Sequence, residues 1–586
     1  MKLPLIDSAS NSTNSAASGA PLSDMRATSL RLVVIANACQ TVDETLSAYR
    51  LNASDAELLE RNNEYYLERY RAMIPTVVGE RREIVDAVNA VRRARGRDDL
   101  INEHNSYALN GIYMYSFLSQ IGYAGRVDLV DNIDMEPERS RALVEKADVV
   151  IFSTTFITSA DTIVRVAKVV KSWNPEVKVV AGGAKLTQFV DDSEIEEAAR
   201  ACDALVLSTN GERTLVELLQ RFDSNRPWDD LPNLALNTSG FFKTTKANDG
   251  VDINQFYVRW DELPHEFLRS AVNVRTGRGC PFKCKFCTFP SYNDQQMDLK
   301  SIPMLLDELR LILKRPEIKT VRFVDDTLFL SKEHLKEVCQ ALIDMNFDRP
   351  WTCYLRASTL TDECARYLRD AGCKLVLVGV ESCDDTVLKN MSKGIREQHN
   401  WQAAENLAKY GILGFAFILN GFPGETQQSI DKTIHFLNNA GMHAYVHSPL
   451  FIFPKSPVSL EAQKYSLQGG FNDWRHDTMT CREAIMSCAR MFEEVTAAAY
   501  IDRGSSITKV LLDHHYSVDE VKELGRLHNQ LAREEIAGAR SPATEAAFET
   551  MALRHADDAN GRKVADFTSP YSRTGGKLQV NAGARF

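Results

Sequence analysis

Residues 278–287 read Arg-Gly-Cys-Pro-Phe-Lys-Cys-Lys-Phe-Cys, so that Cys280, Cys284 and Cys287 follow the spacing C-x3-C-x2-C. Three thiolates on one short loop can hold three irons of a 4Fe–4S cluster and leave the fourth iron open to a chelating molecule. Zinc also accepts thiolates, but a zinc site needs a fourth protein ligand at a regular offset, and none follows nearby. The segment therefore predicts a 4Fe–4S cluster with one open iron.

The cysteine loop comes directly after an apolar stretch, and strand-like and helical stretches alternate from there to about residue 455. The predicted strands are Ala271–Thr276, Thr320–Val324, Trp351–Leu355, Lys374–Val380, Gly414–Leu419 and His443–Leu450. Helical patterns lie between them, at Ser301–Lys314, Lys332–Asn346, Thr361–Ala371 and Trp401–Tyr410. This alternation over residues 265–455 predicts a partial (β/α)6 barrel, with its chemistry where the strands end.

A second alternation precedes the first and predicts an α/β, doubly wound, Rossmann-like domain over residues 29–240. Its strands are Leu30–Ala36, Val127–Val130, Asp148–Ser153, Val177–Ala181 and Ala204–Leu207. A helical insertion of about residues 43–97 interrupts the domain, and we can assign it no chemistry. Ligands of such sheets bind at the carboxyl ends of the strands. These ends carry small or polar residues, which are candidate contacts or ordinary turns: Ser153, Thr155, Gly182, Gly183, Gly211 and Glu212.

The flanking segments and the overall charge exclude several classes of protein. Residues 1–28 are rich in Ser, Ala and Asn and predict a disordered tail, whereas residues 456–586 predict a helical C-terminal region. The net charge of −10 argues against a partner that is a nucleic acid or a membrane surface. No apolar run reaches about 18 residues, so we expect no transmembrane helix.

The chain has 12 cysteines, of which three lie within eight residues and the others are scattered singly. A secreted protein of this size could pair its cysteines in disulfides. The layout seen here favours one metal site in a reducing compartment instead. We therefore expect a cytoplasmic protein.

The cysteine motif, with an aromatic residue before its last cysteine, resembles the signature of the radical S-adenosylmethionine (radical SAM) superfamily, and three further segments support the resemblance. Phe323-Val-Asp325-Asp326 ends the second strand and Gly379-Val-Glu381-Ser382 ends the fourth. Asn420-Gly421-Phe422-Pro423-Gly424-Glu425-Thr426 follows the fifth. The resemblance covers residues 270–450 and is to the class B, methyltransferase-like branch, which carries an N-terminal cobalamin-binding domain.

The resemblance implies that the open iron binds the amino and carboxylate groups of S-adenosylmethionine, which one-electron reduction then cleaves to a 5′-deoxyadenosyl radical. It implies Glu381 as the partner of the ribose hydroxyls, and Asp325 and Asp326 as contacts to cofactor or substrate. Gly421 and Gly424 would let the backbone approach the adenine. Each acidic residue has an alternative role, as the cap of the helix that follows. An electron donor such as a flavodoxin or ferredoxin is implied as a partner.

Residues 30–240 resemble the cobalamin-binding domain of the same branch at Ser153–Thr155, Val179–Gly183 and Asn210–Thr214. One feature of many cobalamin proteins is missing, because the sequence lacks the D-x-H-x-x-G loop that supplies the lower ligand of cobalt. The nearest string places His104 two residues after Asn102, with both flanking residues changed. Cobalamin is therefore expected with no assigned lower ligand, and we expect His104 to be an ordinary exposed histidine.

The leading hypothesis is a cobalamin-dependent radical SAM methyltransferase that acts at an unreactive centre of a small-molecule or peptide substrate. The alternative is a non-methylating radical reaction, such as cyclisation, ring contraction or another carbon–carbon bond formation. A non-catalytic iron–sulfur protein is disfavoured, because electron carriers fill all four iron positions. A methylthiotransferase would need an N-terminal cluster domain, and Cys39 and Cys202 are too isolated to build one. The substrate itself cannot be read from the sequence.

Overall fold

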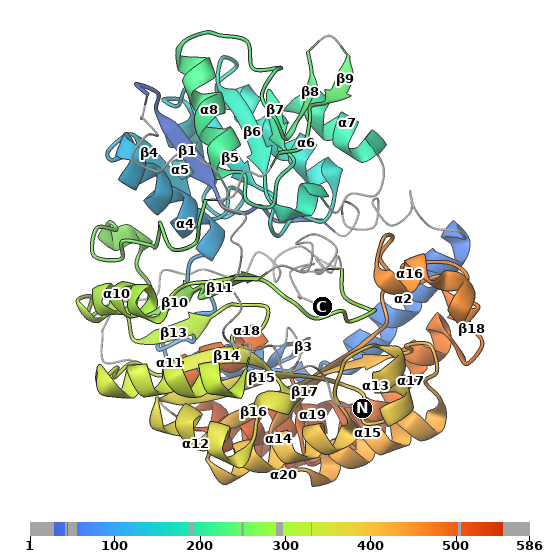
Figure 1. Ribbon diagram of the computed structural model, residues 1–586. Helices are drawn as coiled ribbons and strands as arrows, with labels where there is room; N and C mark the ends of the chain where they lie inside the picture. Colours follow the sequence, from blue (N-terminus) through green and yellow to red (C-terminus); the bar gives the residue numbers. More distant parts are fainter. Residues whose placement is uncertain are drawn as a thin grey trace.

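The computed structural model describes residues 28–41, 44, 55–187, 192–238, 240–247, 251–288, 297–329, 331–501 and 505–554. The predicted N-terminal tail lies outside these ranges except for its last residue, and so do residues 555–586 of the C-terminal region. The described chain forms two α/β units, each built on a seven-stranded sheet. In Figure 1 the first sheet lies at the top and the second at the bottom.

The first sheet has the strand order β4-β1-β5-β6-β7-β8-β9. Its first five strands are parallel, and β8 and β9 are antiparallel at one edge. In chain order the parallel part reads 2-1-3-4-5, a doubly wound order in which ligands bind where the direction of winding reverses. The strands are β1 (Leu32–Ile35), β4 (Val127–Val130), β5 (Val149–Ser153), β6 (Lys178–Gly182), β7 (Ala204–Val206), β8 (Leu234–Asn237) and β9 (Phe241–Lys243).

Helices cover both faces of this sheet, because successive strand residues point to opposite faces. Val33 and Ile35 pack toward α5 (Pro137–Val144), α6 (Ala160–Trp173) and α7 (Asp192–Ala201). Leu32 and Val34 pack toward α4 (Leu109–Leu118) and α8 (Glu212–Asp223). The sequence prediction of a doubly wound sheet is confirmed, and its edge is extended by two strands, β8 and β9, that were not predicted.

The second sheet is parallel throughout and has the order β10-β13-β14-β15-β16-β17-β20. Its strands are β10 (Ala271–Val274), β13 (Thr320–Phe323), β14 (Trp351–Arg356), β15 (Cys373–Glu381), β16 (Leu413–Asn420), β17 (Ala444–Pro449) and β20 (Ala499–Tyr500). The six predicted strands are all present. The seventh, β20, was missed because two residues are too short to show an alternating pattern.

One face of the second sheet carries the helices that connect its strands. They are α10 (Ile302–Leu313), α11 (Lys332–Asp344), α12 (Asp362–Asp370), α13 (Asp385–Asn390), α14 (Glu397–Lys409) and α15 (Gln427–Asn439). Val376 and Val378 of β15 point toward this layer and join its core. A short antiparallel ribbon, β11 (Gly277–Gly279) with β12 (Met297–Leu299), follows β10 and encloses the cysteine loop between its strands.

The opposite face is covered by segments from the two ends of the chain. Leu375 and Leu377 of β15 pack against α3 (Ile84–Ala94), α18 (Ser505–Asp513), α19 (Val518–Ile536) and α20 (Pro542–Ala552). The helical insertion, expected within the first domain, thus belongs to the core of the second unit. Its other helix, α2 (Ala56–Ala72), packs on α17 (Cys481–Glu494), as the blue and orange ribbons in Figure 1 show.

The remaining described elements are short. They are β2 (Thr76–Val77), β3 (Glu80–Arg81), α16 (Pro457–Leu460), β18 (Arg475–His476), β19 (Met479–Thr480) and five single-turn or π-helical segments at Ser119–Tyr123, Ala184–Thr187, His265–Phe267, Ala357–Thr359 and Ala462–Tyr465. None of the described helices has the length and apolar character that a membrane crossing requires.

Candidate active site

The three motif cysteines lie on one loop at the carboxyl end of β10. Cys284 is buried, Cys280 and Cys287 are half-buried, and none of the 12 cysteines is in a disulfide. Backbone bonds fix the loop to its surroundings, because Lys285 donates to the Met391 carbonyl at 2.8 Å and accepts from Val458 N at 2.9 Å. The described part of the loop stops at residue 288, and within the described residues no three His, Cys, Asp or Glu side chains converge on one metal-binding point.

Cationic side chains surround this loop. The Arg356 guanidinium, at the end of β14, lies 3.7 Å from the centre of the Phe282 ring and donates to Cys284 Sγ at 3.7 Å. Lys393 Nζ lies 5.3 Å from the centre of the Phe286 ring. Three soft thiol donors in a cationic setting fit an anionic iron–sulfur cluster, because thiolates prefer iron or zinc and the cations offset the negative charge. Burial raises the pKa of the Cys280 thiol in the protein alone.

Asp325 makes a structural contact that its motif did not reveal. Its Oδ1 accepts the backbone N–H groups of Thr276 and Gly277, at 2.8 and 2.6 Å, which fixes the chain just before the cysteine loop. The side chain is buried, Oδ2 has no hydrogen-bond partner among the described residues, and burial raises the pKa of Asp325 to about 7. Asp326, by contrast, is exposed.

Glu381 is buried beside the cysteine loop and is paired with Lys393, whose Nζ lies 2.6 Å from Glu381 Oε1. Its backbone has a φ of +62°, at a break in the register between β15 and β16. The alternative role of capping the next helix is wrong, because Asp384 caps α13 through the N–H groups of Thr386 and Val387. Glu381 is therefore linked to the cysteine loop through Lys393, which lies over the Phe286 ring.

The glycine-rich turn after β16 is closely packed at Gly421 and Gly424, the two residues predicted to approach the adenine. A Cβ added to Gly421 would lie 2.6 Å from the Trp474 ring, and one added to Gly424 would lie 2.3 Å from Asn390 Nδ2. The neighbouring Glu425 is buried and accepts the Gly421 N–H. Burial raises the pKa of Glu425 to about 8. In this structure both glycines meet protein side chains at these positions.

At the first sheet, the predicted small residues lie together at the carboxyl ends of β5, β6 and β7. A Cβ added to Gly211 would lie 2.5 Å from Val206 Cγ1, and one added to Gly182 would lie 3.3 Å from Val206 Cβ. A Cβ added to Gly183 would lie 3.1 Å from Thr154 Oγ1. These glycines therefore allow the strand ends and turns to approach one another closely.

Polar groups at the same edge are incompletely bonded. Ser153 Oγ lies 3.1 Å from Thr155 Oγ1 and accepts from Asn110 Nδ2 at 2.7 Å. Thr154 Oγ1, Asn110 Oδ1 and Glu212 Oε2 are buried and have no hydrogen-bond partner among the described residues. Buried polar atoms without a partner are costly, so this edge fits a polar ligand such as the amide-bearing rim of a corrin or its nucleotide tail.

Glu212 also makes a contact that the sequence motif did not reveal. Its Oε1 accepts from Arg278 Nη2 at 2.9 Å and from the Tyr113 hydroxyl at 2.9 Å, so it joins the first unit to the cysteine loop. Arg278 lies inside the cysteine motif, so its charge was the one feature of the sequence that could have indicated an acidic partner. Arg356 and Lys393 carry no comparable signal, because they reach the loop only through the fold.

His104 is exposed, and its backbone N–H donates to Asn102 Oδ1 at 2.9 Å. The segment is tied to the second unit, because Asn105 donates to Asp513 Oδ2 at 2.7 Å and accepts from the Ala271 N–H at 3.0 Å. Nothing in these contacts assigns His104 to a metal.

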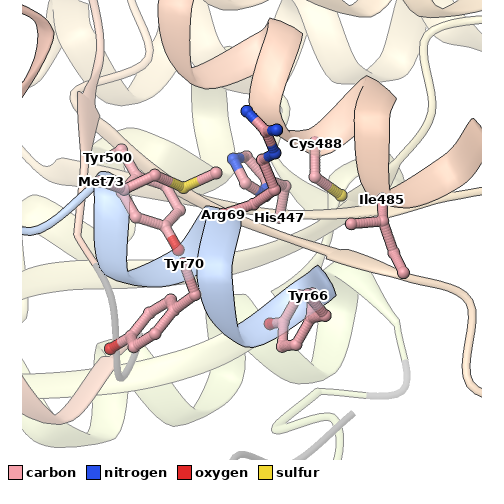
Figure 2. A pocket seen from close by; sticks show the side chains of 8 residues that line it. All are labelled: Tyr66, Arg69, Tyr70, Met73, His447, Ile485, Cys488 and Tyr500. Carbon is pink, nitrogen blue, oxygen red and sulfur yellow. The ribbon is translucent and has the colours of Figure 1, made fainter. Parts of the chain in front are cut away.

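A small pocket lies between α2, β17, α17 and β20 (Figure 2). Burial lowers the pKa of His447 in this pocket to about 3, so its imidazole is neutral at pH 7. None of the predicted site residues lines the pocket, whose lining residues are Tyr66, Arg69, Tyr70, Met73, His447, Ile485, Cys488 and Tyr500.

Comparison with known proteins agrees with this arrangement. Residues 274–437 match the family model of the radical SAM superfamily. An uncharacterized methyltransferase of Pyrococcus horikoshii is 28% identical over 301 residues, which are 50% of this chain and 65% of that protein. The anaerobic magnesium-protoporphyrin IX monomethyl ester cyclase of Rubrivivax gelatinosus is 24% identical over 338 residues, 55% of this chain and 60% of that one. The chain thus spans less than two thirds of the length of these curated relatives.

Among solved structures, the radical SAM methyltransferase TsrM of Kitasatospora setae, with cobalamin and a [4Fe-4S] cluster bound, has the same fold at a TM-score of 0.56. It is 14% identical, and the match covers 87% of this chain and 100% of that one. Both α/β units therefore occur together in a known protein. With the family match over the cysteine loop and most of the second sheet, residues 274–437 form a domain of the radical SAM superfamily.

Proposed function

We propose that the protein is a cobalamin-dependent radical SAM methyltransferase that acts at an unreactive centre of a small-molecule or peptide substrate. One observation carries the proposal: the buried Glu212–Arg278 pair joins the carboxyl edge of a doubly wound sheet to a loop of three cysteines, none of them in a disulfide. A methyl carrier and a source of radicals must lie close together for such a reaction. An enzyme with only one of the two would not need this junction.

In this proposal Cys280, Cys284 and Cys287 hold the 4Fe–4S cluster. The second sheet forms the partial barrel around it, with Glu381 and the exposed Asp326 facing the cofactor and Gly421 and Gly424 shaping the turn at the adenine side. When bound, the cluster supplies the electron that opens S-adenosylmethionine and cobalamin supplies the methyl carrier. The protein orients these groups and keeps water away from them.

The chain's own charges prepare the loop for an anionic group. Arg356 and Lys393 place two cations at the cysteine loop, which would stabilise negative charge in a site with little water. Asp325 holds the backbone of Thr276 and Gly277 in place. We assign Asp325 a positioning role and Glu381 the contact to the ribose.

At the first sheet we propose that Ser153, Thr155 and Gly211 line the corrinoid site, together with Gly182 and Gly183. Their support is the group of unpartnered polar atoms at the same edge. Glu212 stands at the border of this site and is engaged by Arg278. A flavodoxin or ferredoxin would deliver the electrons, and 12 cysteines without a disulfide suit the reducing cytoplasm.

A non-methylating radical reaction is the second candidate, because one relative is named as a cyclase. A cyclisation or ring contraction would use the same radical source with no methyl transfer. The two reactions differ in what becomes of S-adenosylmethionine, and this difference provides the test.

The test is a product count under anaerobic conditions with reductant, S-adenosylmethionine, hydroxocobalamin and a confirmed substrate. A methyltransferase should release 5′-deoxyadenosine and S-adenosylhomocysteine in near-equal amounts, one from each cofactor molecule used. 5′-Deoxyadenosine without matching homocysteine product would move the assignment to the non-methylating reaction. The Cys280→Ala, Cys284→Ala, Cys287→Ala triple variant should lose about four irons per chain, and retention of the cluster would refute the proposal.

A further inference from the structure

A buried charged cluster joins the two α/β units beside the cysteine loop. Arg278 Nη2 lies 2.9 Å from Glu212 Oε1 and 2.5 Å from the Tyr113 hydroxyl, which itself donates to Glu212 Oε1 at 2.9 Å. The side chains of Arg278 and Glu212 are only 10% and 6% exposed. Arg278 Nη1 also donates to the Val251 carbonyl at 3.1 Å. The cluster therefore closes a network between α4, α8, the interdomain segment and β11.

Each end of this network is attached to one of the two proposed cofactor sites. Glu212 is the first residue of α8 and follows Gly211 at the carboxyl edge of the first sheet. Arg278 lies in β11, two residues before Cys280, and the chain just before it is fixed by Asp325. A change in the position of the first turn of α8 would therefore reach the cysteine loop through one guanidinium group.

The cluster is also costly to keep. Buried ion pairs repay the loss of hydration only when their geometry is good, and well-packed apolar residues often replace them without loss of stability. Here Glu212 Oε2 is buried without a hydrogen-bond partner among the described residues. Burial raises the pKa of Tyr113, so its hydroxyl stays protonated and donates. A cluster that is incompletely bonded in this way suits a position that a ligand completes.

We propose that Glu212, Arg278 and Tyr113 are positioning residues that couple corrinoid binding at the first sheet to S-adenosylmethionine binding at the cysteine loop. The inference rests on the proposed function. A corrinoid that orders the Gly211–Glu212 turn holds Arg278, and through it the loop, in the conformation that binds the second cofactor. Such coupling is reciprocal, so each cofactor must tighten the binding of the other by the same factor.

The experiment measures binding of S-adenosylmethionine to the reconstituted full-length protein by equilibrium dialysis, with and without saturating hydroxocobalamin. Binding of hydroxocobalamin with and without S-adenosylmethionine gives the reciprocal value. For the wild type we expect each cofactor to tighten the other by about fivefold or more. Glu212→Gln keeps the shape of the side chain and removes its charge. In this variant we expect both cofactors still to bind, while the effect of each on the affinity of the other falls to about onefold, which means no coupling.

Three further variants separate positioning from a merely structural role. Arg278→Lys keeps the charge and loses the planar guanidinium that donates in several directions, so it should lower the coupling. Tyr113→Phe removes one hydrogen-bond donor and should lower the coupling less. Glu262→Gln is the matched control, because Glu262 pairs with Arg259 at 2.8 Å on the surface, and it should leave the coupling unchanged. The paramagnetic resonance spectrum of the reduced cluster should shift on corrinoid addition in the wild type and not in Glu212→Gln.

The outcomes are distinguishable. If the wild type binds no corrinoid, the proposed function fails and the inference fails with it. If the wild type binds both cofactors without mutual tightening, or if Glu212→Gln and Arg278→Lys retain the full coupling, the inference alone is overturned. If Glu212→Gln does not fold, the comparison of Tyr113→Phe with Glu262→Gln decides, and equal coupling in these two overturns the inference.

Discussion

Glu381 adopts a backbone conformation that few side chains adopt, with a φ of +62° at the end of β15. Non-glycine residues in this region carry about 1–3 kcal/mol of strain, which is typical of sites where a side chain must point in one direction. Here the carboxylate is held against Lys393, next to the aromatic ring that precedes Cys287. The residue that the motif indicated is therefore fixed by a partner that the motif did not contain.

The first prediction concerns this pair. Lys393→Met should destabilise the protein by about 3–5 kcal/mol, because it leaves the Glu381 carboxylate buried without its cation. Urea denaturation followed by circular dichroism would measure the loss. The matched control is Lys389→Met, because Lys389 is exposed on α13, and it should change the stability by about 0.5 kcal/mol or less. Equal effects of the two substitutions would show that the pair contributes nothing to the fold.

The second prediction concerns Glu425, whose pKa burial raises to about 8 in the folded protein. The unfolded chain loses this proton near its ordinary pKa of 4.5, so between pH 4.5 and 8 the folded state binds more protons. The contribution of Glu425 is therefore full below pH 4.5 and falls as the pH rises to 8, at up to about 1.4 kcal/mol per pH unit.

Glu425→Gln should remove this slope, because the amide does not titrate. Denaturant midpoints of the wild type and the variant, taken at pH 5 and at pH 8, give the difference directly. The wild type should lose more stability between these two pH values than the variant. An identical loss in both would mean that Glu425 is ionised in the folded protein.

At the scale of elements, the turn after β16 shows why its sequence is rich in glycine. Gly421 has a φ of +95°, and its Cα faces the Trp474 ring and the Ala484 methyl group, which an added Cβ would meet at 2.6 and 2.7 Å. The turn therefore brings β16 into contact with α17 and with the segment before β18. The approach to the adenine that the resemblance implies stays a prediction, and the structure adds these contacts within the chain.

The third prediction compares two glycines of positive φ. Gly421→Ala should cost well over the 1–2 kcal/mol of the left-handed conformation, because Trp474 or Ala484 must also move. Gly411→Ala is the control, since Gly411 has a φ of +65° and open space around an added Cβ. Gly411→Ala should lower the free energy of unfolding only by the cost of the left-handed backbone conformation. Urea midpoints measure both, and equal costs would show that the contacts at Gly421 yield easily.

The strands were the easiest elements to predict, and the reason is physical. Residues 374–380 form a nearly continuous apolar run because both faces of β15 are buried, one by the connecting helices and one by α3, α18 and α19. The two-residue β20 has no such run, although it extends the same sheet. The placement of α3 was equally hidden, because an amphipathic pattern shows that a helix has a buried face and does not show what covers it.

The candidate site likewise has one part that the sequence predicts and one part that it does not. Three cysteines in one loop can be recognised locally, because their spacing is itself the chemical feature. Arg356 and Lys393 reach that loop from 72 and 109 residues away from Cys284, and Glu212 reaches Arg278 across 66 residues. Partners that meet only through the fold leave no pattern in a single sequence, so the supporting charges of the site could not be predicted.

At the scale of the whole molecule, the two units share one apolar core. Leu32 and Val34 of the first sheet and Val272 and Val376 of the second belong to the same cluster, which continues through Trp260 of the connecting segment. Two units joined by a small polar interface would move and unfold separately. A continuous core, reinforced by the Glu212–Arg278 pair, favours unfolding of both units together and a fixed distance between the two proposed cofactor sites.

The last prediction tests this continuity with a substitution on the far side of the first unit. Ile35 is fully buried in the core between β1 and the helices α5, α6 and α7, away from the second unit. Ile35→Ala should cost about 2–5 kcal/mol, because it leaves a cavity in a packed core. If the molecule unfolds as one, amide hydrogens of β15 and β16 that exchange only by global unfolding must exchange about thirtyfold faster or more. Hydrogen exchange followed by mass spectrometry measures this in the intact chain. Unchanged protection of β15 and β16, beside faster exchange in β1 and β5, would show that the two units unfold independently.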